Sequence, residues 1–398
     1  MTILSNRVLN LAESETLAMA RRGNELKEKG VDVINMSLGE PDFKTPDFIK
    51  RAAKEAIDKD FSYYTPVPGY KDLQEAVCRK FKRDNGLDYK ANQIVVSTGA
   101  KQSIMNVIMA LVNPGDEVLL PGPYWVSYSE MVSLNGGVNV IAPSGIETDF
   151  KITAAELEKY ITPKTKVCLF SSPCNPSGAT YTEAELRGLA EVFKKHPQVV
   201  IVSDEIYEHI NFMGKNFSIA AVPELFNRTV TVNGLSKAFA MTGWRLGYIG
   251  APKEIADPCN TIQGQFTSGP SSISQRAAIA ALDADPREAV APMAVEFRKR
   301  RDLFVKLFKE IPHVKVNNPG GAFYLFPEVS WYFGKSDGKT VIKDARELCL
   351  WLLDEAHVAI TPGGSFGAPN YIRFSYATSE DKITEAALRV KNALAKLK

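Results

Sequence analysis

Residues 231–247 read TVNGLSKAFAMTGWRLG and form the most informative stretch of the chain. A β-branched run at 229–232 precedes Lys237, and small and apolar residues surround this lysine on both sides. Desolvation among such neighbours lowers the pKa of an amine and makes it a competent nucleophile towards a carbonyl group. Arg245 follows in the same stretch and is placed to share an anion with this turn. A lone lysine is usually a surface charge, so the prediction depends on the whole stretch.

Carboxylates follow the preceding apolar run. Residues 199–202 are Val-Val-Ile-Val, and Ser203-Asp204-Glu205-Ile206-Tyr207 come directly after them. Ligands of open α/β sheets bind at the carboxyl ends of the strands, so Asp204 is placed to pair with a cationic heterocycle and Tyr207 to bond a neighbouring oxygen. The alternative is a helix-capping Asp204 with a solvated Glu205, and these residues alone leave both interpretations open.

A third stretch, VVSTGAKQ at 95–102, passes from a strand-like run through small residues into a helical pattern. The free N–H groups at such a helix start favour an anion. An ordinary turn between strand and helix is the alternative, because the glycines form neither GxGxxG nor a Walker A loop.

Composition excludes several classes of protein. The chain has 398 residues, of which 45% are hydrophobic and 24% charged, and its net charge is +2. These values are typical of a folded globular protein and offer no basic footprint for nucleic acid or an anionic membrane. The five cysteines form no CxxC pair, and the N-terminal residues 1–30 are too charged for a signal peptide. We therefore expect a soluble, cytoplasmic protein with reduced thiols.

Metal and hydrolase chemistry are disfavoured by the histidines. The chain has four of them, and none stands at HxxxH or HExxH spacing. A catalytic zinc and a Ser-His-Asp site therefore lack support, and no metal is expected.

Short β-branched runs recur between residues 90 and 250, several of them separated by helical patterns, which is typical of a mainly parallel sheet. We expect an α/β fold with a seven-stranded sheet from the runs 94–97, 117–120, 138–141, 167–170, 199–203, 229–232 and 246–249. Thr182 and Glu185 form a capping box before one helix. Thr45-Pro46 predicts another helix start, with Thr45 as the N-cap and proline at the first helical position.

The pattern changes after residue 290 to that of an α+β unit. A charged helix is expected at 295–309, strands at 321–326, 358–361 and 371–376, and a last helix from Ser379. The N-terminal segment up to Gly39 is too short to fold alone, so we expect it to pack on this unit or on another subunit. The predicted domains are a large one, 46–289, and a discontinuous small one, 1–45 plus 290–398.

Taken together, these motifs resemble the fold-type-I pyridoxal 5′-phosphate aminotransferases of class I, specifically the prokaryotic-type aspartate aminotransferases. The resemblance runs almost end to end through LGEPDF at 38–43, YTP at 64–66, PYW at 123–125, NPSG at 175–178, DEIY at 204–207, SKAFAMTGWR at 236–245 and RFSY at 373–376. It implies a large cofactor-binding α/β domain and a smaller α+β domain.

The resemblance also implies roles in binding the cofactor ring. Lys237 would bind pyridoxal 5′-phosphate covalently and, once displaced by substrate, move the proton at the substrate α-carbon. Asp204 would keep the pyridine nitrogen protonated. Asn175 and Tyr207 would hydrogen-bond the phenolic oxygen, and Trp125 would stack on the ring.

The cofactor phosphate would be bound at the helix start in 95–102. By resemblance its ligands are the backbone at Gly99, Ala100 and Lys101, the side chains of Ser236 and Arg245, and Tyr64 from a neighbouring subunit. A tyrosine shared in this way implies a homodimer, whereas the alternative for Tyr64 is a core aromatic.

For the substrate, Arg373 matches the arginine that binds the α-carboxylate, and Gly39, Trp125 and Asn175 would line the same pocket. Members of the family with a distal arginine carry it in the region that corresponds to 261–270, where this chain has none. Lys101, near Thr16, would replace it, although a solvated lysine at a helix start is the alternative. Because a cation there opposes the helix dipole, the functional role is favoured.

The resemblance therefore implies a ping-pong transamination between L-aspartate and 2-oxoglutarate that gives oxaloacetate and L-glutamate. The partners expected are small amino acids, 2-oxo acids and a second copy of the chain. Prephenate, aromatic or kynurenine transamination remain as alternatives. A lyase of the aminocyclopropane-carboxylate synthase type is a further alternative, since it would keep the same cofactor residues.

Overall fold

The computed structural model describes residues 3–9 and 11–398, and its largest sheet has seven strands in the order β2-β8-β7-β6-β5-β3-β4. Neighbours from β7 to β4 run parallel, whereas β8 is antiparallel to both β7 and β2. The mainly parallel sheet is confirmed. The strands are β2 (Ile94–Ser97), β3 (Glu117–Pro121), β4 (Val138–Ala142), β5 (Thr165–Ser171), β6 (Val200–Asp204), β7 (Thr229–Gly234) and β8 (Gly247–Gly250).

Helices cover both faces of this sheet, and the strand residues alternate between two cores. Leu169 of β5 lies in one core and Phe170 in the other, because successive side chains of a strand point to opposite faces. Both faces are therefore apolar, which accounts for the continuous hydrophobic runs in the sequence. The covering helices include α5 (Ala100–Leu111), α6 (Ser127–Leu134), α7 (Ala154–Tyr160), α8 (Glu183–Lys195), α9 (Pro223–Phe226) and α10 (Lys253–Phe266).

The two predicted helix starts differ in outcome. The capping box before α8 is confirmed: Glu185 N–H donates to Thr182 Oγ1 at 3.2 Å, and Glu185 Oε2 accepts from the Thr182 N–H at 2.7 Å. The expected cap at Thr45 is wrong, because α3 (Asp47–Asp58) has Pro46 at its N-cap. The Thr45 hydroxyl instead donates to the carbonyl of Ala240 at 2.8 Å, so a distant loop takes the group that would have capped the helix. Helix α11 (Ser272–Asp283) packs against both α3 and α4 (Lys71–Lys80).

The C-terminal part contains two small sheets. A three-stranded antiparallel sheet has the order β11-β12-β9, and β10 pairs in parallel with β1 near the N-terminus. The expected strand 358–361 is therefore divided at Ile360 between two sheets. The strand expected at 321–326 is reduced to β9, and the one at 371–376 to β12. The strands are β1 (Ile34–Asn35), β9 (Tyr324–Leu325), β10 (Val358–Ala359), β11 (Thr361–Pro362) and β12 (Ile372–Ser375).

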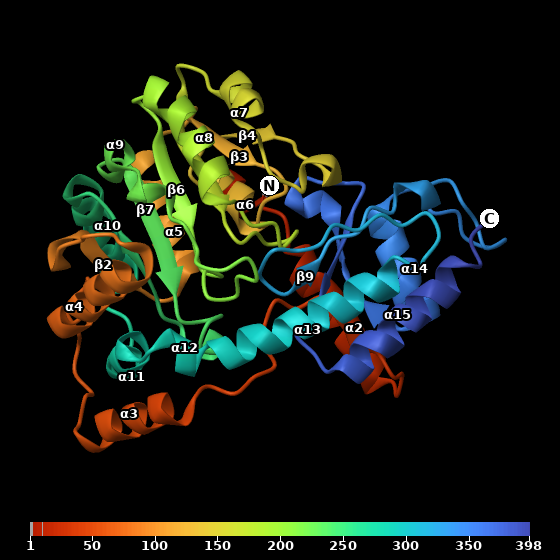
Figure 1. The fold of residues 1–398 in the computed structure, drawn as a ribbon, viewed down its shortest axis with the longest axis horizontal. Coiled ribbons are helices and arrows are strands. Elements are labelled where there is room, and N and C mark those ends of the chain that lie inside the picture. Colours follow the sequence, from red (N-terminus) through yellow and green to blue (C-terminus); the bar gives the residue numbers. More distant parts are fainter. Residues whose placement is uncertain (1–2, 10) are drawn as a thin grey trace.

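The N-terminal segment packs on the C-terminal part, as expected, through β1 and α2. In Figure 1, α13 runs from the large sheet towards α14 and α15. No helix within the described residues is long and apolar enough to cross a membrane. The remaining helices are α1 (Asn6–Leu9), α2 (Glu15–Glu28), α12 (Pro286–Ala289), α13 (Ala291–Phe308), α14 (Ala345–Ala356) and α15 (Glu380–Leu394).

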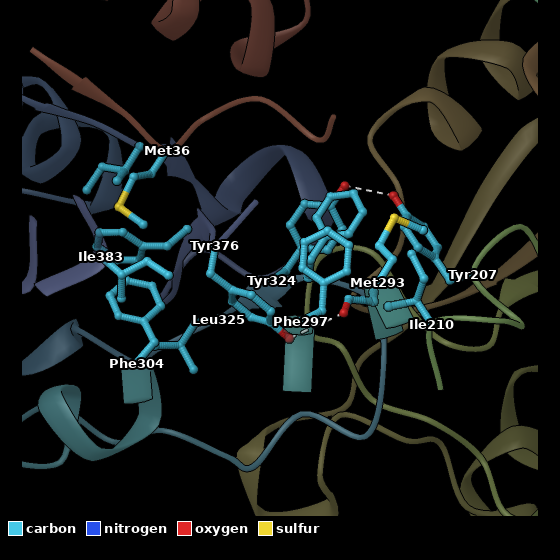
Figure 2. Close-up of a cluster of buried hydrophobic side chains, with 14 of the residues drawn as sticks. Met36, Tyr207, Ile210, Met293, Phe297, Phe304, Tyr324, Leu325, Tyr376 and Ile383 are labelled. Atoms are coloured by element: carbon cyan, nitrogen blue, oxygen red, sulfur yellow. Dashed lines mark hydrogen bonds between the residues drawn. The ribbon is translucent and has the colours of Figure 1, made fainter. Parts of the chain in front are cut away.

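A buried aromatic cluster connects these parts of the molecule. Phe297 of α13 stacks on Phe323 with ring centroids 5.0 Å apart, and Phe323 in turn contacts Tyr207 from the large sheet. Figure 2 shows Tyr207 and Tyr324 at one end of this cluster, where their hydroxyls share a hydrogen bond of 2.7 Å. The cluster therefore fixes β9 against the end of β6, next to Asp204.

Candidate active site

A cavity of about 380 Å³ lies where the carboxyl ends of the strands meet the C-terminal part and the N-terminal segment. Most residues that the sequence analysis singled out line it. They are Thr16, Gly39, Ala100, Lys101, Trp125, Asn175, Asp204, Tyr207, Ser236, Lys237, Arg245 and Arg373. Two candidates, Gly99 and Tyr64, do not line it.

Lys237 lies in the loop between β7 and β8. Because β8 returns antiparallel to β7, this loop stays at the carboxyl edge of the sheet. Nζ of Lys237 donates to the carbonyl of Gly39 at 2.5 Å. Burial lowers the pKa of Lys237 to about 8, and the nearby carboxylate of Glu40 offsets only part of this effect. Roughly a tenth of the amine is therefore neutral at pH 7, far more than for an ordinary lysine, and the neutral amine is the form that attacks a carbonyl group.

Asp204 is the last residue of β6 and is buried. Its Oδ2 accepts from the Tyr128 hydroxyl at 2.6 Å, and its Oδ1 accepts from the Ile206 N–H at 3.1 Å. Burial raises the pKa of Asp204 to about 6 despite these bonds. Within the described part of the chain, no lysine or arginine forms an ion pair with this carboxylate. A buried carboxylate without a cation is unfavourable, so the site suits a cationic ligand.

Glu205 is not the solvated side chain of the alternative interpretation. It is buried, and its Oε1 accepts from the hydroxyls of Ser203 at 3.0 Å and Ser218 at 2.5 Å. Burial, followed by the nearby Glu208 carboxylate, raises the pKa of Glu205 to about 8. The two adjacent carboxyl groups therefore point into different surroundings, and only Asp204 reaches the cavity.

Arg373 of β12 brings a buried guanidinium to the cavity. It donates to Asn175 Oδ1 at 2.9 Å and to the carbonyl of Ser37, and its plane lies over the ring of Tyr324 at 4.7 Å. Its Nε has no hydrogen-bond partner, and among residues 3–9 and 11–398 no acidic side chain pairs with it. Burial lowers the pKa of Arg373. A planar donor in this state is suited to a carboxylate ligand.

At the start of α5, the chain leaves room for Arg245. Gly99 has a φ of +86°, and a Cβ at this position would collide with the guanidinium of Arg245. Arg245 donates to the carbonyl of Thr242 at 2.8 Å and has no acidic partner in the part of the chain that the structure describes. Gly99 thus shapes the cavity without lining it, and this helix start with its arginine is suited to a phosphate.

Lys101 and Tyr64 differ in their relation to the cavity. Nζ of Lys101 lies 5.0 Å from the ring of Trp125, and burial and the neighbouring Arg245 lower the pKa of Lys101. Tyr64 is 99% exposed, so the alternative of a core aromatic is wrong. Tyr64 is not among the described residues that line the cavity.

Comparison with known proteins identifies the family. The model of the family described as aminotransferase class I and II matches residues 31–390. The chain belongs to the class I and II aminotransferases. It is 47% identical over 393 residues to an aspartate/prephenate aminotransferase of Cereibacter sphaeroides, which covers 98% of both chains. It is also 47% identical to a bifunctional aspartate aminotransferase and glutamate/aspartate-prephenate aminotransferase of Petunia hybrida, over 99% of this chain and 83% of the other.

Solved structures agree with this assignment. The aspartate aminotransferase of Rhizobium meliloti superposes with a TM-score of 0.96 at 41% identity and full coverage of both chains. The aspartate aminotransferase of Thermus thermophilus with maleate gives a TM-score of 0.91 at 38% identity over 99% of this chain and 100% of that one. The fold-type-I architecture expected from the sequence is therefore confirmed.

This aminotransferase uses pyridoxal 5′-phosphate, and the chemistry of the cavity is compatible with that cofactor. The ring nitrogen of the cofactor requires an anion, and its aldehyde requires an amine of lowered pKa. Its phosphate requires a helix start that carries a cation. Asp204, Lys237 and the helix start with Arg245 offer these three features around one cavity.

Sequence reasoning missed four residues that hold the site together. Tyr128 bonds Asp204, Tyr324 bonds Tyr207, and Ser37 and Thr361 accept hydrogen bonds from Arg373. Tyr128 stands three residues after Trp125, where a helical turn brings side chains together, so its spacing offered a weak signal. Tyr324 and Thr361 lie in predicted strands and Ser37 in a loop, and these patterns do not indicate which side chains meet the site residues.

Proposed function

We propose that this aminotransferase transfers the amino group of L-aspartate to 2-oxoglutarate by a ping-pong reaction that yields oxaloacetate and L-glutamate. The observation that carries the proposal is the buried guanidinium of Arg373, which has no acidic partner among the described residues and shares the cavity with Lys237. Lys101 adds a second cation from α5. A dicarboxylic substrate matches two cations, and the names of the relatives support this substrate class.

The residues around the cofactor ring have distinct roles in this proposal. Lys237 binds the cofactor through Nζ and, when substrate takes its place, moves the proton at the substrate α-carbon. The cofactor, when bound, withdraws electrons from that carbon. Asp204 holds the ring nitrogen, Asn175 and Tyr207 bond the phenolic oxygen, and Trp125 stacks on the ring.

The phosphate and the substrate are bound by separate groups. The phosphate is held by the backbone of Gly99, Ala100 and Lys101 and by the side chains of Ser236 and Arg245. For the substrate, Arg373 binds the α-carboxylate and Lys101 the distal one. Gly39, Asn175, Trp125 and Thr16 complete the substrate pocket.

The active unit in this proposal is a homodimer in which Tyr64 binds the phosphate of the partner subunit. Tyr64 is almost fully exposed among the described residues of one chain, so its side chain is free to contact a partner subunit. Analytical ultracentrifugation should give a dimer, and Tyr64→Phe should weaken cofactor binding. Normal cofactor binding by this variant would contradict the shared site.

We also propose that residues 46–289 form the large domain and that 1–45 plus 290–398 form the small one. Substrate bound to Arg373 then connects the two, and this draws the small domain over the cavity. A structure with a trapped substrate analogue and an unchanged domain angle would contradict the closure. All five cysteines are free thiols, which supports a reducing, cytoplasmic location.

Prephenate is a second candidate substrate. The relatives of Cereibacter sphaeroides and Petunia hybrida both carry prephenate in their names. The Lys101 ammonium lies against the Trp125 ring, so this wall offers a cation and an apolar face side by side. Such a wall accepts a carboxylate on either a short chain or a ring.

The test is the visible absorption of the purified holoenzyme. L-Aspartate should remove the cofactor band and 2-oxoglutarate should restore it, whereas L-alanine and L-phenylalanine should act weakly. Recovery with prephenate would establish the second candidate. A band that answers only to another amino acid would overturn the aspartate assignment.

Lys101→Ser tests the distal site separately. We expect kcat/KM for aspartate and glutamate to fall about 10- to 100-fold, the effect of losing a hydrogen bond to a charged group. The kcat/KM for alanine should change less than about twofold, because alanine has no distal carboxylate. Lys54→Ser on the exposed face of α3 is the matched control. Equal losses for alanine and aspartate would contradict the role of Lys101.

A further inference from the structure

Tyr128, on the first turn of α6, is fully buried between Asp204 and Trp125. Its hydroxyl donates to Oδ2 of Asp204 at 2.6 Å, across 76 positions of sequence. Its ring meets the Trp125 ring edge-on, with centroids 5.5 Å apart and an interplanar angle of 88°. One side chain therefore contacts both the carboxylate and the indole that face the cofactor ring in the proposed function.

The two hydrogen bonds to Asp204 leave it able to bind a further donor. Oδ1 takes the Ile206 N–H and Oδ2 takes the Tyr128 hydroxyl. A carboxylate oxygen has two lone pairs, so each oxygen keeps one for a ligand. Both bonds favour the ionised form, and they oppose the burial that favours the neutral acid.

We propose that Tyr128 is a positioning residue for the cofactor, whose hydroxyl keeps Asp204 ionised and directs its carboxylate at the ring nitrogen. The inference rests on the proposed role of Asp204. A protonated Asp204 would present no full negative charge to the nitrogen. Without the Tyr128 hydroxyl, only the Ile206 N–H and the charge of Lys237 oppose the effect of burial, so a larger share of Asp204 is neutral at neutral pH.

Other groups that face Asp204 do not replace this hydroxyl. Lys237 approaches from the loop after β7 and favours the ionised carboxylate only through its charge. Tyr207 follows on the turn after β6, and its hydroxyl bonds Tyr324. The Cys174 thiol, after β5, donates to the carbonyl of Pro123 at 3.4 Å. Tyr128 is therefore the side-chain donor to Asp204 within the described residues.

The experiment compares Tyr128→Phe, Asp204→Asn and their double variant with the wild-type protein, each freed of cofactor and then titrated with it. Phenylalanine keeps the edge-on contact with Trp125 and removes only the hydroxyl. The readout is the dissociation constant of pyridoxal 5′-phosphate as a function of pH, measured by fluorescence titration of the cofactor-free chain. Tyr181→Phe is the matched control, because the Tyr181 hydroxyl is also buried and hydrogen-bonded, at 2.9 Å to the Ile152 N–H, but lies outside the cavity.

We expect Tyr128→Phe to raise this dissociation constant about 10- to 100-fold, as for the loss of a hydrogen bond to a charged group. The weakening of binding at low pH should begin at a higher pH than in the wild type. In the double variant, binding should be no weaker than in Asp204→Asn alone, since Tyr128 acts through Asp204. Tyr181→Phe should bind the cofactor normally.

The outcomes distinguish a failure of the proposed function from a failure of the inference about Tyr128. If Asp204→Asn binds the cofactor normally, the proposed function loses its ring-nitrogen ligand, and the inference about Tyr128 fails with it. If Asp204→Asn binds weakly but Tyr128→Phe resembles Tyr181→Phe, only the inference is overturned. An equal effect of Tyr128→Phe with and without the Asp204 carboxylate would show a general packing role and would also overturn it.

Discussion

Replacing Lys80 by methionine should destabilise the protein strongly, although Lys80 lies outside the cavity. Lys80 on α4 contacts Glu208, and each side chain is only 3% exposed. Its Nζ also donates to Asn85 at 2.8 Å, and Glu208 accepts from Asn85 at 2.8 Å and from Asn233 at 2.7 Å. The ammonium is therefore the cation in a buried network that connects the turn after β6 with the end of β7.

The magnitude follows from what Lys80→Met leaves behind. Methionine fills a similar volume, so the main loss is the charge that compensates Glu208. Removing one partner of a buried ion pair destabilises a protein by about 3–5 kcal/mol. Glu208 can escape by taking up a proton, which at pH 7 and an ordinary pKa of 4.5 requires about 3 kcal/mol. The two estimates agree, and we expect a loss of about 3–5 kcal/mol in the free energy of unfolding.

The pH dependence gives a second signature. Burial by itself raises the pKa of Glu208, but Lys80, His209 and hydrogen bonds outweigh it and lower the pKa to about 2. In the wild type, this contribution to stability is present above pH 4.5 and is lost as the pH falls towards 2. In Lys80→Met the protonated form becomes easier to reach at lower pH. The difference between variant and wild type should therefore shrink from pH 7 towards pH 4.5.

Urea unfolding followed by tryptophan fluorescence measures this loss. Lys253→Met is the control, because Lys253 pairs with Asp257 in a surface ion pair whose side chains are 56% and 58% exposed. We expect it to lose less than about 1 kcal/mol. The double variant Lys80→Met/Glu208→Gln should recover part of the stability, since no uncompensated charge remains. A loss for Lys80→Met no larger than that for Lys253→Met would refute the reasoning.

Three further outcomes are expected. Lys237→Ala should abolish turnover and remove the visible band produced with the lysine amine, while cofactor association persists in part; an active variant would contradict the assignment. The rate at which the cofactor-free chain binds pyridoxal 5′-phosphate should rise as the pH is raised through about 8, because the pKa of the Lys237 amine is lowered to that value. A stopped-flow rate that does not change with pH would contradict the lowered pKa of Lys237. Dialysis against a chelator should leave activity and the urea midpoint unchanged. Asp84, Glu208 and His209 bring potential metal-ligand atoms within 4.8 Å of one another, but the ammonium of Lys80 already supplies the positive charge that a metal ion would bring there.

Much of the fold was predictable because its signals are local. Strands buried on both faces appear as continuous apolar runs, and the capping box of Thr182 and Glu185 is complete within four consecutive residues. Lys237 and Asp204 were also accessible, since Asp204 ends β6 and Lys237 lies in the loop after β7, both at the carboxyl edge of the sheet. The sequence pattern and the structure coincide wherever neighbouring residues determine the outcome.

The differences arise where distant partners decide. Thr45 has the side chain of a helix cap, yet the carbonyl of Ala240, 195 positions away, takes its hydroxyl. Ile360 stands in a strand-like run, but β10 pairs with the N-terminal segment and β11 with β12, so the run is divided. Tyr128 donates to Asp204 from 76 positions away, and only the folded chain brings the two side chains together. Such contacts depend on the packing of elements and leave no periodicity in the sequence.

Asp204 and Arg373 bring buried charges of opposite sign to the cavity, and the two side chains do not pair with each other. Neutral groups satisfy each of them: Tyr128 and the Ile206 N–H bond Asp204, whereas Asn175 and the carbonyl of Ser37 bond Arg373. A direct ion pair between the two would have occupied both binding groups. Because each charge is held by neutral partners, a cationic ring and an anionic substrate can both bind without breaking an ion pair. The unpaired charges of Asp204 and Arg373 are therefore the feature that prepares this fold for ligands of both signs.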